Sequence, residues 1–177
     1  MIIVEGIDRV GKTTIAKMIS KKLGIKIFDN PYMDFTWIDS NNETKVATKK
    51  ASYKNMFVNL ERMNVMLNFL EQFKTEDYIA DRFHMTEYVY GKNDRGYKNL
   101  SAFNQIDERL ANLGAIIVYV KPKDINWSSE QHGSDLSSHL KDFNELIGIT
   151  KCKVITCDCD SLEEAVCELA KMLEVYK

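Results

Sequence analysis

The feature that most constrains the fold is a glycine-containing loop close to the start of the chain. Residues 2–4 form a short apolar run, and the segment from Gly6 to Thr13 then reads GIDRVGKT, which fits the pattern G-x-x-x-x-G-K-[ST]. Residues 12–23 continue as a helix-like run. In a strand, glycine loop and helix of this order, backbone N–H groups and the helix N-terminus bind phosphate. The sequence therefore predicts a nucleoside triphosphate site early in the chain.

The polar residues of this loop suit such a site. Lys12 reaches the β- and γ-phosphates, and the Thr13 hydroxyl is a ligand for Mg²⁺. Asp8 and Arg9 add a carboxylate and a guanidinium, and Arg9 is suited to stabilise charge on a phosphoryl group in transfer. The loop thus predicts ATP or GTP with Mg²⁺. The residues predicted to hold the nucleotide are Gly6, Asp8, Arg9, Val10, Gly11, Lys12, Thr13 and Thr14.

Strand-like and helix-like runs alternate along the chain. The strand-like segments are 2–4, 24–28, 78–80, 115–120 and 154–157. The helix-like segments are 12–23, 43–73, 101–112, 134–147 and 162–176. An apolar stripe at steps of three and four, typical of core packing, consists of Met56, Leu60, Met63, Leu67 and Leu70. The alternation predicts an α/β fold in three layers, a parallel five-stranded sheet with helices on both faces.

Composition and charge limit the class of protein. The chain has 177 residues, 45% of them hydrophobic, and two prolines, so we expect a single domain over residues 1–177. Its 24 basic and 26 acidic residues give a net charge of −2, without the basic excess of most nucleic-acid-binding proteins. No apolar run approaches the roughly 18 residues that span a bilayer, and the N-terminus lacks a signal-peptide pattern. We expect a cytoplasmic protein that binds a small-molecule nucleotide and no membrane, with nucleic acid disfavoured but still open.

A second pair of charged residues follows a later strand. Asp81 and Arg82 come directly after the apolar segment 78–80. Ligands of open α/β sheets bind at the carboxyl ends of the parallel strands, so both side chains are expected at the same edge as the glycine loop. A carboxylate there suits a metal or water contact, and the planar guanidinium suits phosphate.

Two motifs together carry a family resemblance. The segment EGIDRVGKTT, from Glu5 to Thr14, resembles the start of thymidylate kinases, specifically the subtype with an arginine in the phosphate-binding loop. Asp81-Arg82-Phe83 resembles the Asp-Arg-aromatic motif of that family, and Arg62 precedes it at about the spacing of the family's base-reading arginine. The resemblance is strong over about residues 1–23, moderate over about 57–92 and weak in the last third of the chain.

The resemblance implies a P-loop nucleotide kinase fold, with ATP and Mg²⁺ as cofactors. Lys12 and Thr13 would hold the ATP phosphates and Mg²⁺, and Asp81 would act near the metal or the acceptor. The implied catalytic residues are Arg9, Lys12, Asp81 and Arg82, and the implied metal ligands are Thr13 and Asp81.

The resemblance also implies how the acceptor is bound. Arg82 would clamp the acceptor phosphate and Asp8 would contact the sugar. Arg62 would hydrogen-bond the pyrimidine, and Tyr90 stands where the family often has an aromatic near the base. The implied substrate-binding residues are Asp8, Arg62, Arg82 and Tyr90.

The sequence departs from the family pattern in two regions. The segment 121–133, which corresponds to the family's lid, contains lysines but no arginine. No arginine lies between Arg9 and Arg62, although the family commonly has one after the second strand for the acceptor phosphate. Val58 also stands where the family has an aromatic residue. The lysines that could replace the missing arginine are Lys45, Lys49 and Lys50.

The leading hypothesis is phosphoryl transfer from ATP to a pyrimidine deoxynucleoside monophosphate, with dTMP as the expected acceptor. The departures keep two alternatives open: a deoxynucleoside kinase, or a kinase of a modified pyrimidine such as 5-hydroxymethyluracil, including in DNA. A non-catalytic nucleotide-binding regulator is a further alternative, although the N-K-x-D-like motif of GTPases is absent. A homodimer is also open.

Overall fold

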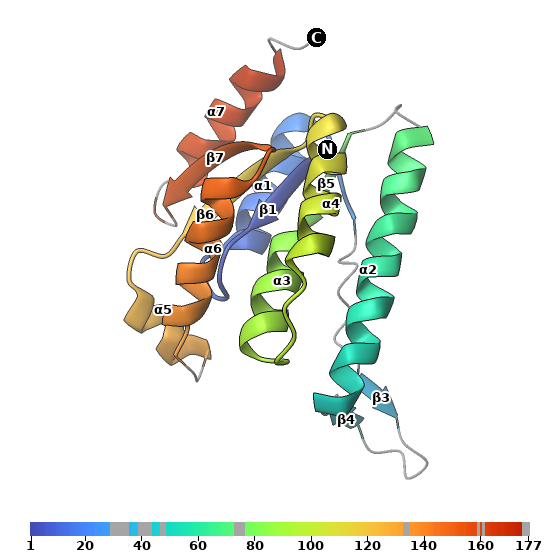
Figure 1. Cartoon of the computed structure of the whole chain (residues 1–177). Helices are drawn as coiled ribbons and strands as arrows, with labels where there is room; N and C mark the ends of the chain where they lie inside the picture. Colours follow the sequence, from blue (N-terminus) through green and yellow to red (C-terminus); the bar gives the residue numbers. More distant parts are fainter. Residues whose placement is uncertain are drawn as a thin grey trace.

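The computed structural model describes residues 1–28, 36–38, 44–46, 49–72, 77–132, 135–158, 160 and 162–174. Its centre is a five-stranded sheet in the order β2-β5-β1-β6-β7, and every pairing in it is parallel (Figure 1). The strands are β1 (Ile2–Glu5), β2 (Lys26–Phe28), β5 (Tyr78–Asp81), β6 (Ile116–Lys121) and β7 (Lys153–Asp158). The predicted parallel five-stranded sheet is confirmed, including the strand predicted within residues 24–28.

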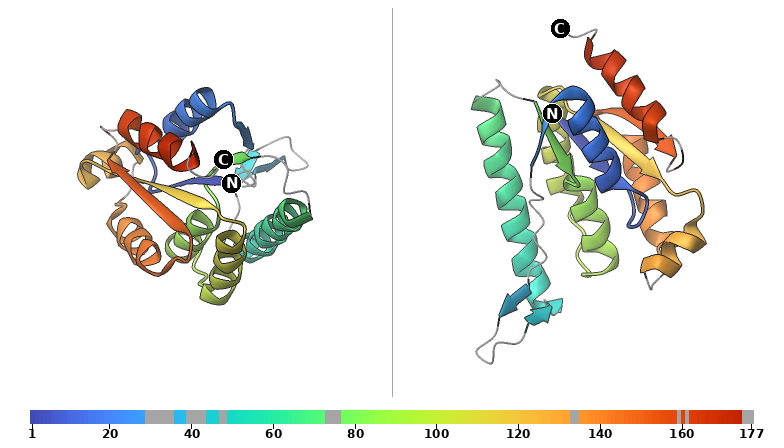
Figure 2. Two further views of the ribbon diagram at one scale, coloured as in Figure 1. Left: turned by 90° about the horizontal axis from the view of Figure 1, so that it is seen from above. Right: turned by 180° about the vertical axis from the view of Figure 1, so that it is seen from behind.

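Helices cover both faces of this sheet, as predicted. The helices are α1 (Lys12–Leu23), α2 (Lys49–Gln72), α3 (His84–Asn93), α4 (Leu100–Asn112), α5 (Ile125–His132), α6 (Ser137–Ile149) and α7 (Leu162–Glu174). Seen from above in Figure 2, α1 and α7 lie together on one face, whereas α3, α4 and α6 lie on the other. Helix α2 packs against α3 and α4. None of the helices that the structure describes is long and apolar enough to cross a membrane.

Sequence reasoning was wrong about the start of α2. The predicted helix 43–73 includes residues 44–46, which instead form strand β4 (Thr44–Val46), paired antiparallel with β3 (Thr36–Ile38). β-Branched residues such as Thr44 and Val46 favour strands, and pairing with a second strand overrides a weak helical pattern. The hairpin lies beside the first turns of α2 in Figure 1.

The core lies between the sheet and its helices. Residues 2–4 of β1 and 116–120 of β6 are buried, because both strands are central and covered on both faces. The predicted stripe of α2 also packs inward: Met63 and Leu67 are fully buried and Leu70 nearly so. The side chain of Met56 lies outside the described residues. The sheet register aligns Val4 with Asp81, so the carboxyl ends of β1 and β5 lie side by side.

Candidate active site

The loop between β1 and α1 requires glycine at both ends of the motif. Gly6 has φ +143°, and a Cβ atom there would lie 2.5 Å from the Val120 carbonyl oxygen. Gly11 has φ +89° and forms the N-cap of α1. Both backbone conformations are strained for residues with a side chain. The predicted strand–loop–helix cradle is therefore present, with the N-terminus of α1 at its end.

Lys12 is the buried cation of this loop. Only 4% of its side chain is exposed; its ammonium group donates a hydrogen bond to the Ile7 carbonyl and lies 3.6 Å from Asp8 Oδ1. Burial lowers the pKa of Lys12 to about 8, the charge of Arg82 acts in the same direction, and Asp8 opposes both. A phosphate group would restore charge balance here, since it brings negative charge to a desolvated ammonium.

Thr13 and Asp81 meet across the neighbouring strands. The Thr13 hydroxyl donates a 2.6 Å hydrogen bond to Asp81 Oδ2. The other carboxylate oxygen, Oδ1, is buried and has no hydrogen-bond partner among the described residues. Mg²⁺ is usually bound by one or two protein oxygens together with substrate phosphates and water. A hydroxyl and a carboxylate with an unused buried oxygen fit that requirement, and no larger cluster of metal-binding side chains occurs in the described part of the chain.

Asp8 joins the loop to two further elements. Its Oδ1 lies 2.6 Å from an Nη atom of Arg82 in the turn after β5. Its backbone N–H donates a 2.9 Å hydrogen bond to the hydroxyl oxygen of Tyr90 on α3. Burial raises the pKa of the Tyr90 phenol, and the Asp8 carboxylate adds to the rise, so Tyr90 stays neutral. The structure therefore brings Asp8, Arg82 and Tyr90 together at the loop.

Both arginines proposed for catalysis have an uncommon backbone conformation. Arg9 has φ +67° and Arg82 has φ +78°, and they are the non-glycine residues with positive φ in the part of the chain described. A side-chain-bearing residue in this region costs about 1–3 kcal/mol and is found most often at functional sites. Arg9 is exposed on the loop, whereas Arg82 is part-buried against Asp8.

The remaining predicted residues lie around this cluster. Val10 is buried beneath the loop and Thr14 is exposed in the first turn of α1. Arg62 has an exposed side chain on α2, one residue before the buried Met63, and its role in base recognition stays a prediction. Part of the predicted lid, 121–133, forms helix α5. The segment after β2 and the side chains of Lys45, Lys49, Lys50 and Val58 lie outside the described residues.

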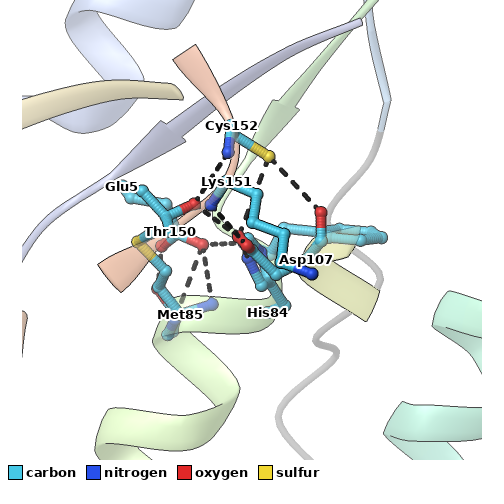
Figure 3. Close-up of polar contacts among 9 residues, drawn as sticks. Glu5, His84, Met85, Asp107, Thr150, Lys151 and Cys152 are labelled. Carbon is cyan, nitrogen blue, oxygen red and sulfur yellow. Dashed lines mark hydrogen bonds and ion pairs between the residues drawn. The ribbon is translucent and has the colours of Figure 1, made fainter. Parts of the chain in front are cut away.

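Sequence reasoning missed Glu5 as a structural element of the site. Glu5 ends β1, directly before Gly6, and its carboxylate is fully buried. Figure 3 shows it next to Met85 at the N-terminus of α3. The carboxylate accepts hydrogen bonds from the backbone N–H groups of Met85 and of Phe83, the N-cap residue. No sequence signal identified this contact, because most of its hydrogen-bond partners are backbone groups of a helix that the hydrophobic pattern did not reveal.

Comparison with known proteins supports the fold. No family model and no curated protein matches the sequence. Among solved structures, the YorR protein of Bacillus subtilis, in complex with phosphorylated GDP, aligns with a TM-score of 0.70 at 20% identity over 99% of this chain and 96% of that one. Deoxyadenosine kinase from M. mycoides with bound dATP aligns at 0.59 and 18% identity over 98% of both chains. Thymidylate kinase from Ehrlichia chaffeensis aligns at 0.58 and 17% identity, over 98% of this chain and 97% of that one.

The chain has the fold of nucleotide kinases. The alignments span nearly the whole chain, and two of these neighbours are named as kinases of a deoxynucleoside and of a thymidine nucleotide. The predicted P-loop kinase fold is thereby confirmed. At identities of 17–20%, the similarity identifies the fold and leaves the reaction and the acceptor to be argued from the site.

Proposed function

We propose that this protein is a magnesium-dependent nucleotide kinase that transfers the γ-phosphoryl group of ATP to a nucleoside monophosphate. The observation that carries the proposal is the convergence of Lys12, the Thr13–Asp81 pair and the Asp8–Arg82 pair at the carboxyl ends of β1 and β5. Phosphoryl transfer needs positioned charge far more than covalent chemistry, and this cluster supplies charge of both signs around one loop.

The glycine loop binds the phosphoryl donor, ATP. Its backbone N–H groups and the N-terminus of α1 hold the triphosphate, and Lys12 contacts the β- and γ-phosphates. Thr13 and Asp81 would hold Mg²⁺, which neutralises phosphate charge when bound. Arg9, at φ +67° on the exposed part of the loop, stabilises the charge of the phosphoryl group in transfer.

The acceptor side belongs to the turn after β5 and to α3. Arg82 is paired with Asp8 at 2.6 Å. An acceptor phosphate competes with Asp8 for the guanidinium, because phosphate accepts a bidentate pair of hydrogen bonds from arginine. Asp8 is then released toward a sugar hydroxyl, while its backbone stays fixed by Tyr90.

We further propose a pyrimidine deoxynucleoside monophosphate, dTMP above all, as the acceptor. Support comes from the motif resemblance, which assigns Arg62 to the pyrimidine, and from Tyr90, whose phenol lies at the loop. One fold neighbour is named as a kinase of a nucleoside, deoxyadenosine, and another as a kinase of a nucleotide, thymidylate, so the acceptor has to be tested directly.

A coupled assay of ADP release tests both proposals. Purified protein is supplied with ATP, Mg²⁺ and one acceptor at a time: dTMP, dUMP, dCMP, dAMP, dGMP or the corresponding nucleosides. The expected result is turnover with a monophosphate, fastest with dTMP, and loss of turnover after chelation of Mg²⁺. Turnover with another monophosphate would correct the acceptor alone, whereas turnover only with nucleosides, or with no acceptor, would contradict the proposed reaction.

Asp81→Asn provides the matched metal test. The substitution keeps the shape of the side chain and weakens a metal ligand, so we expect a rise of about tenfold or more in the Mg²⁺ concentration needed for half-maximal turnover. Asp158→Asn, in an exposed residue at the end of β7, serves as the control and keeps the wild-type Mg²⁺ requirement.

A further inference from the structure

The N-terminus of α3 is capped by a residue from a distant strand. Glu5 Oε1 accepts hydrogen bonds from the backbone N–H groups of Phe83 at 2.9 Å and Met85 at 3.2 Å. Its other oxygen accepts a 2.5 Å hydrogen bond from the Thr86 hydroxyl. The residue at the N-cap position, Phe83, has no polar side chain and makes no capping hydrogen bond of its own.

This cap satisfies groups that the helix itself leaves without partners. The first N–H groups of an α-helix lack intrahelical acceptors, and a carboxylate beside them is also favoured by the helix dipole. Burial raises the pKa of Glu5, against the opposing effects of His84 and of the hydrogen bonds from Thr86 and Phe83. A fully buried carboxylate is costly to desolvate, so its place here depends on these donors.

The same carboxylate fixes the backbone on one side of Arg82. The Arg82 N–H donates a 2.9 Å hydrogen bond to the Val4 carbonyl, and the next N–H, that of Phe83, binds Glu5. Two consecutive residues of β1 thus bind two consecutive N–H groups of the turn. These hydrogen bonds hold the backbone at Arg82, which has a left-handed conformation with φ +78°. In this conformation the guanidinium of Arg82 forms an ion pair with Asp8.

A second buried contact anchors His84, the first residue of α3, to α4. His84 Nε2 lies 3.0 Å from Asp107 Oδ1 on α4, and the His84 ring stacks on Phe103. Asp107 also accepts hydrogen bonds from the Thr150 hydroxyl and the Lys151 N–H before β7 (Figure 3). The start of α3 is therefore fixed to α4 and the loop before β7, and the Glu5 side chain joins it to β1, the strand that leads into the glycine loop.

We infer that Glu5 is a positioning residue for phosphoryl transfer, which fixes the Arg82 turn and α3 relative to the glycine loop that follows it directly in the chain. The inference rests on the proposed function, because Arg82 is taken to bind the acceptor and the loop to bind ATP. The Glu5 carboxylate thereby keeps a constant distance between the glycine loop, proposed to bind ATP, and Arg82, proposed to bind the acceptor. Misplacement of such groups by about 1 Å can lower a rate by about 100-fold.

Two pairs of variants test the inference. Glu5→Met has a similar length and no acceptor, whereas Glu5→Gln keeps one oxygen for the Phe83 and Met85 N–H groups. Thr86→Val removes the hydroxyl at constant shape, and Thr86→Ser retains it. Glu168→Gln, in an exposed residue of α7, is the control. For each variant we would measure the melting temperature, kcat, the KM for ATP and for the acceptor, and hydrogen exchange of the Phe83 and Met85 amides.

The expected result is a graded loss of rate with intact ATP binding. We expect kcat to fall about 100-fold in Glu5→Met and less than about tenfold in Glu5→Gln, with the KM for ATP within about threefold of wild type. The Phe83 and Met85 amides should exchange at least about tenfold faster in Glu5→Met than in the control. Thr86→Val should lower kcat about threefold to tenfold, and Thr86→Ser should restore it.

Contrary results are equally specific. Folded Glu5→Met with wild-type kcat and wild-type amide exchange would overturn the positioning role, as would equal losses in Thr86→Val and Thr86→Ser. Because hydrogen exchange needs no substrate, unchanged exchange overturns the inference even if the acceptor is misidentified. Lack of turnover by the wild-type protein with every acceptor would instead contradict the proposed function.

Discussion

The turn after β5 and the face between α2 and α4 each hold an arginine against a carboxylate, but the backbone differs between them. Arg109 lies inside the regular helix α4, and its guanidinium donates hydrogen bonds to Glu71, Asn64 and Asn68 on α2. The backbone of Arg82 has a left-handed conformation, and its guanidinium forms an ion pair with Asp8 on the glycine loop. Arg109, with its several hydrogen bonds, joins two helices, whereas Arg82, with its strained backbone, contacts the glycine loop. Backbone strain, more than the number of hydrogen bonds, distinguishes the arginine that we propose to bind the acceptor from the arginine that joins two helices.

The largest expected effect in this comparison follows from Arg82→Gly. Glycine adopts φ +78° without strain, which offsets the lost ion pair, so the free energy of unfolding should stay within about 1 kcal/mol of wild type. The kcat should fall about 1,000-fold, because the acceptor phosphate loses its bidentate partner. Urea denaturation and the ADP-release assay measure the two quantities. A stable variant that retains wild-type kcat would remove Arg82 from the reaction.

The strained backbone of the glycine loop is tested by Gly6→Ala. The new Cβ would lie 2.5 Å from the Val120 carbonyl oxygen, at φ +143°, so we expect the free energy of unfolding to fall by about 3 kcal/mol or more. Gly24→Ala is a matched control, because Gly24 also has positive φ but nothing within 4 Å of its added Cβ. It should lose only about 1 kcal/mol in the same urea denaturation. Equal losses in both variants would mean that Val120 imposes no constraint.

Electrostatic coupling at the loop predicts a pH effect on ATP affinity. Burial and Arg82 lower the pKa of Lys12 to about 8 in the ligand-free protein, so Lys12 loses its charge as the pH rises above about 8. The affinity for ATP should therefore decrease, approaching about tenfold per pH unit between pH 8.5 and 10, as measured by calorimetric titration. Lys12→Arg stays charged and should show no such decrease. A pH-independent wild-type affinity over this range would contradict the lowered pKa.

The smallest expected effect belongs to the other arginine. Arg109→Ala removes exposed contacts between α2 and α4, so the free energy of unfolding should fall by about 1 kcal/mol, and less at high salt. The kcat should be unchanged, since Arg109 lies away from the glycine loop on α4. Denaturation at low and high salt, with the ADP-release assay, measures both. A large loss of kcat at constant stability would contradict a purely structural role for Arg109.

The central fold was predictable because its strands are uniformly apolar and its first loop has a specific pattern. Helix α3 was not, because packing on several sides buries polar residues within it, including His84, Thr86 and Glu87. No amphipathic pattern arises when a helix is enclosed in this way. Strand β4 was misassigned because its pairing partner is another short strand, and such pairing is not visible in local composition.

In the candidate site, the side-chain motifs were predictable from the sequence, whereas the contacts with backbone groups were not. The strand order and the family resemblance predicted Asp81 and Arg82 at the same edge of the sheet as the glycine loop. The structure places both in contact with the loop, Asp81 with Thr13 and Arg82 with Asp8. The left-handed conformation of Arg82 and the cap formed by Glu5 depend on hydrogen bonds with backbone groups. Backbone N–H groups are present at nearly every residue, so a sequence gives no indication of which ones a buried carboxylate will bind.

The central position of β1 also has a consequence for the order of folding. Ile2 pairs with both Ile79 and Ile116, so the first strand of the chain obtains its neighbours only after residues far along the chain are available. During synthesis, the strand that carries the glycine loop cannot be enclosed until β5 and β6 have left the ribosome. Nucleotide binding by a growing chain would thus report completion of the sheet, and stalled fragments that end before β6 should not acquire it.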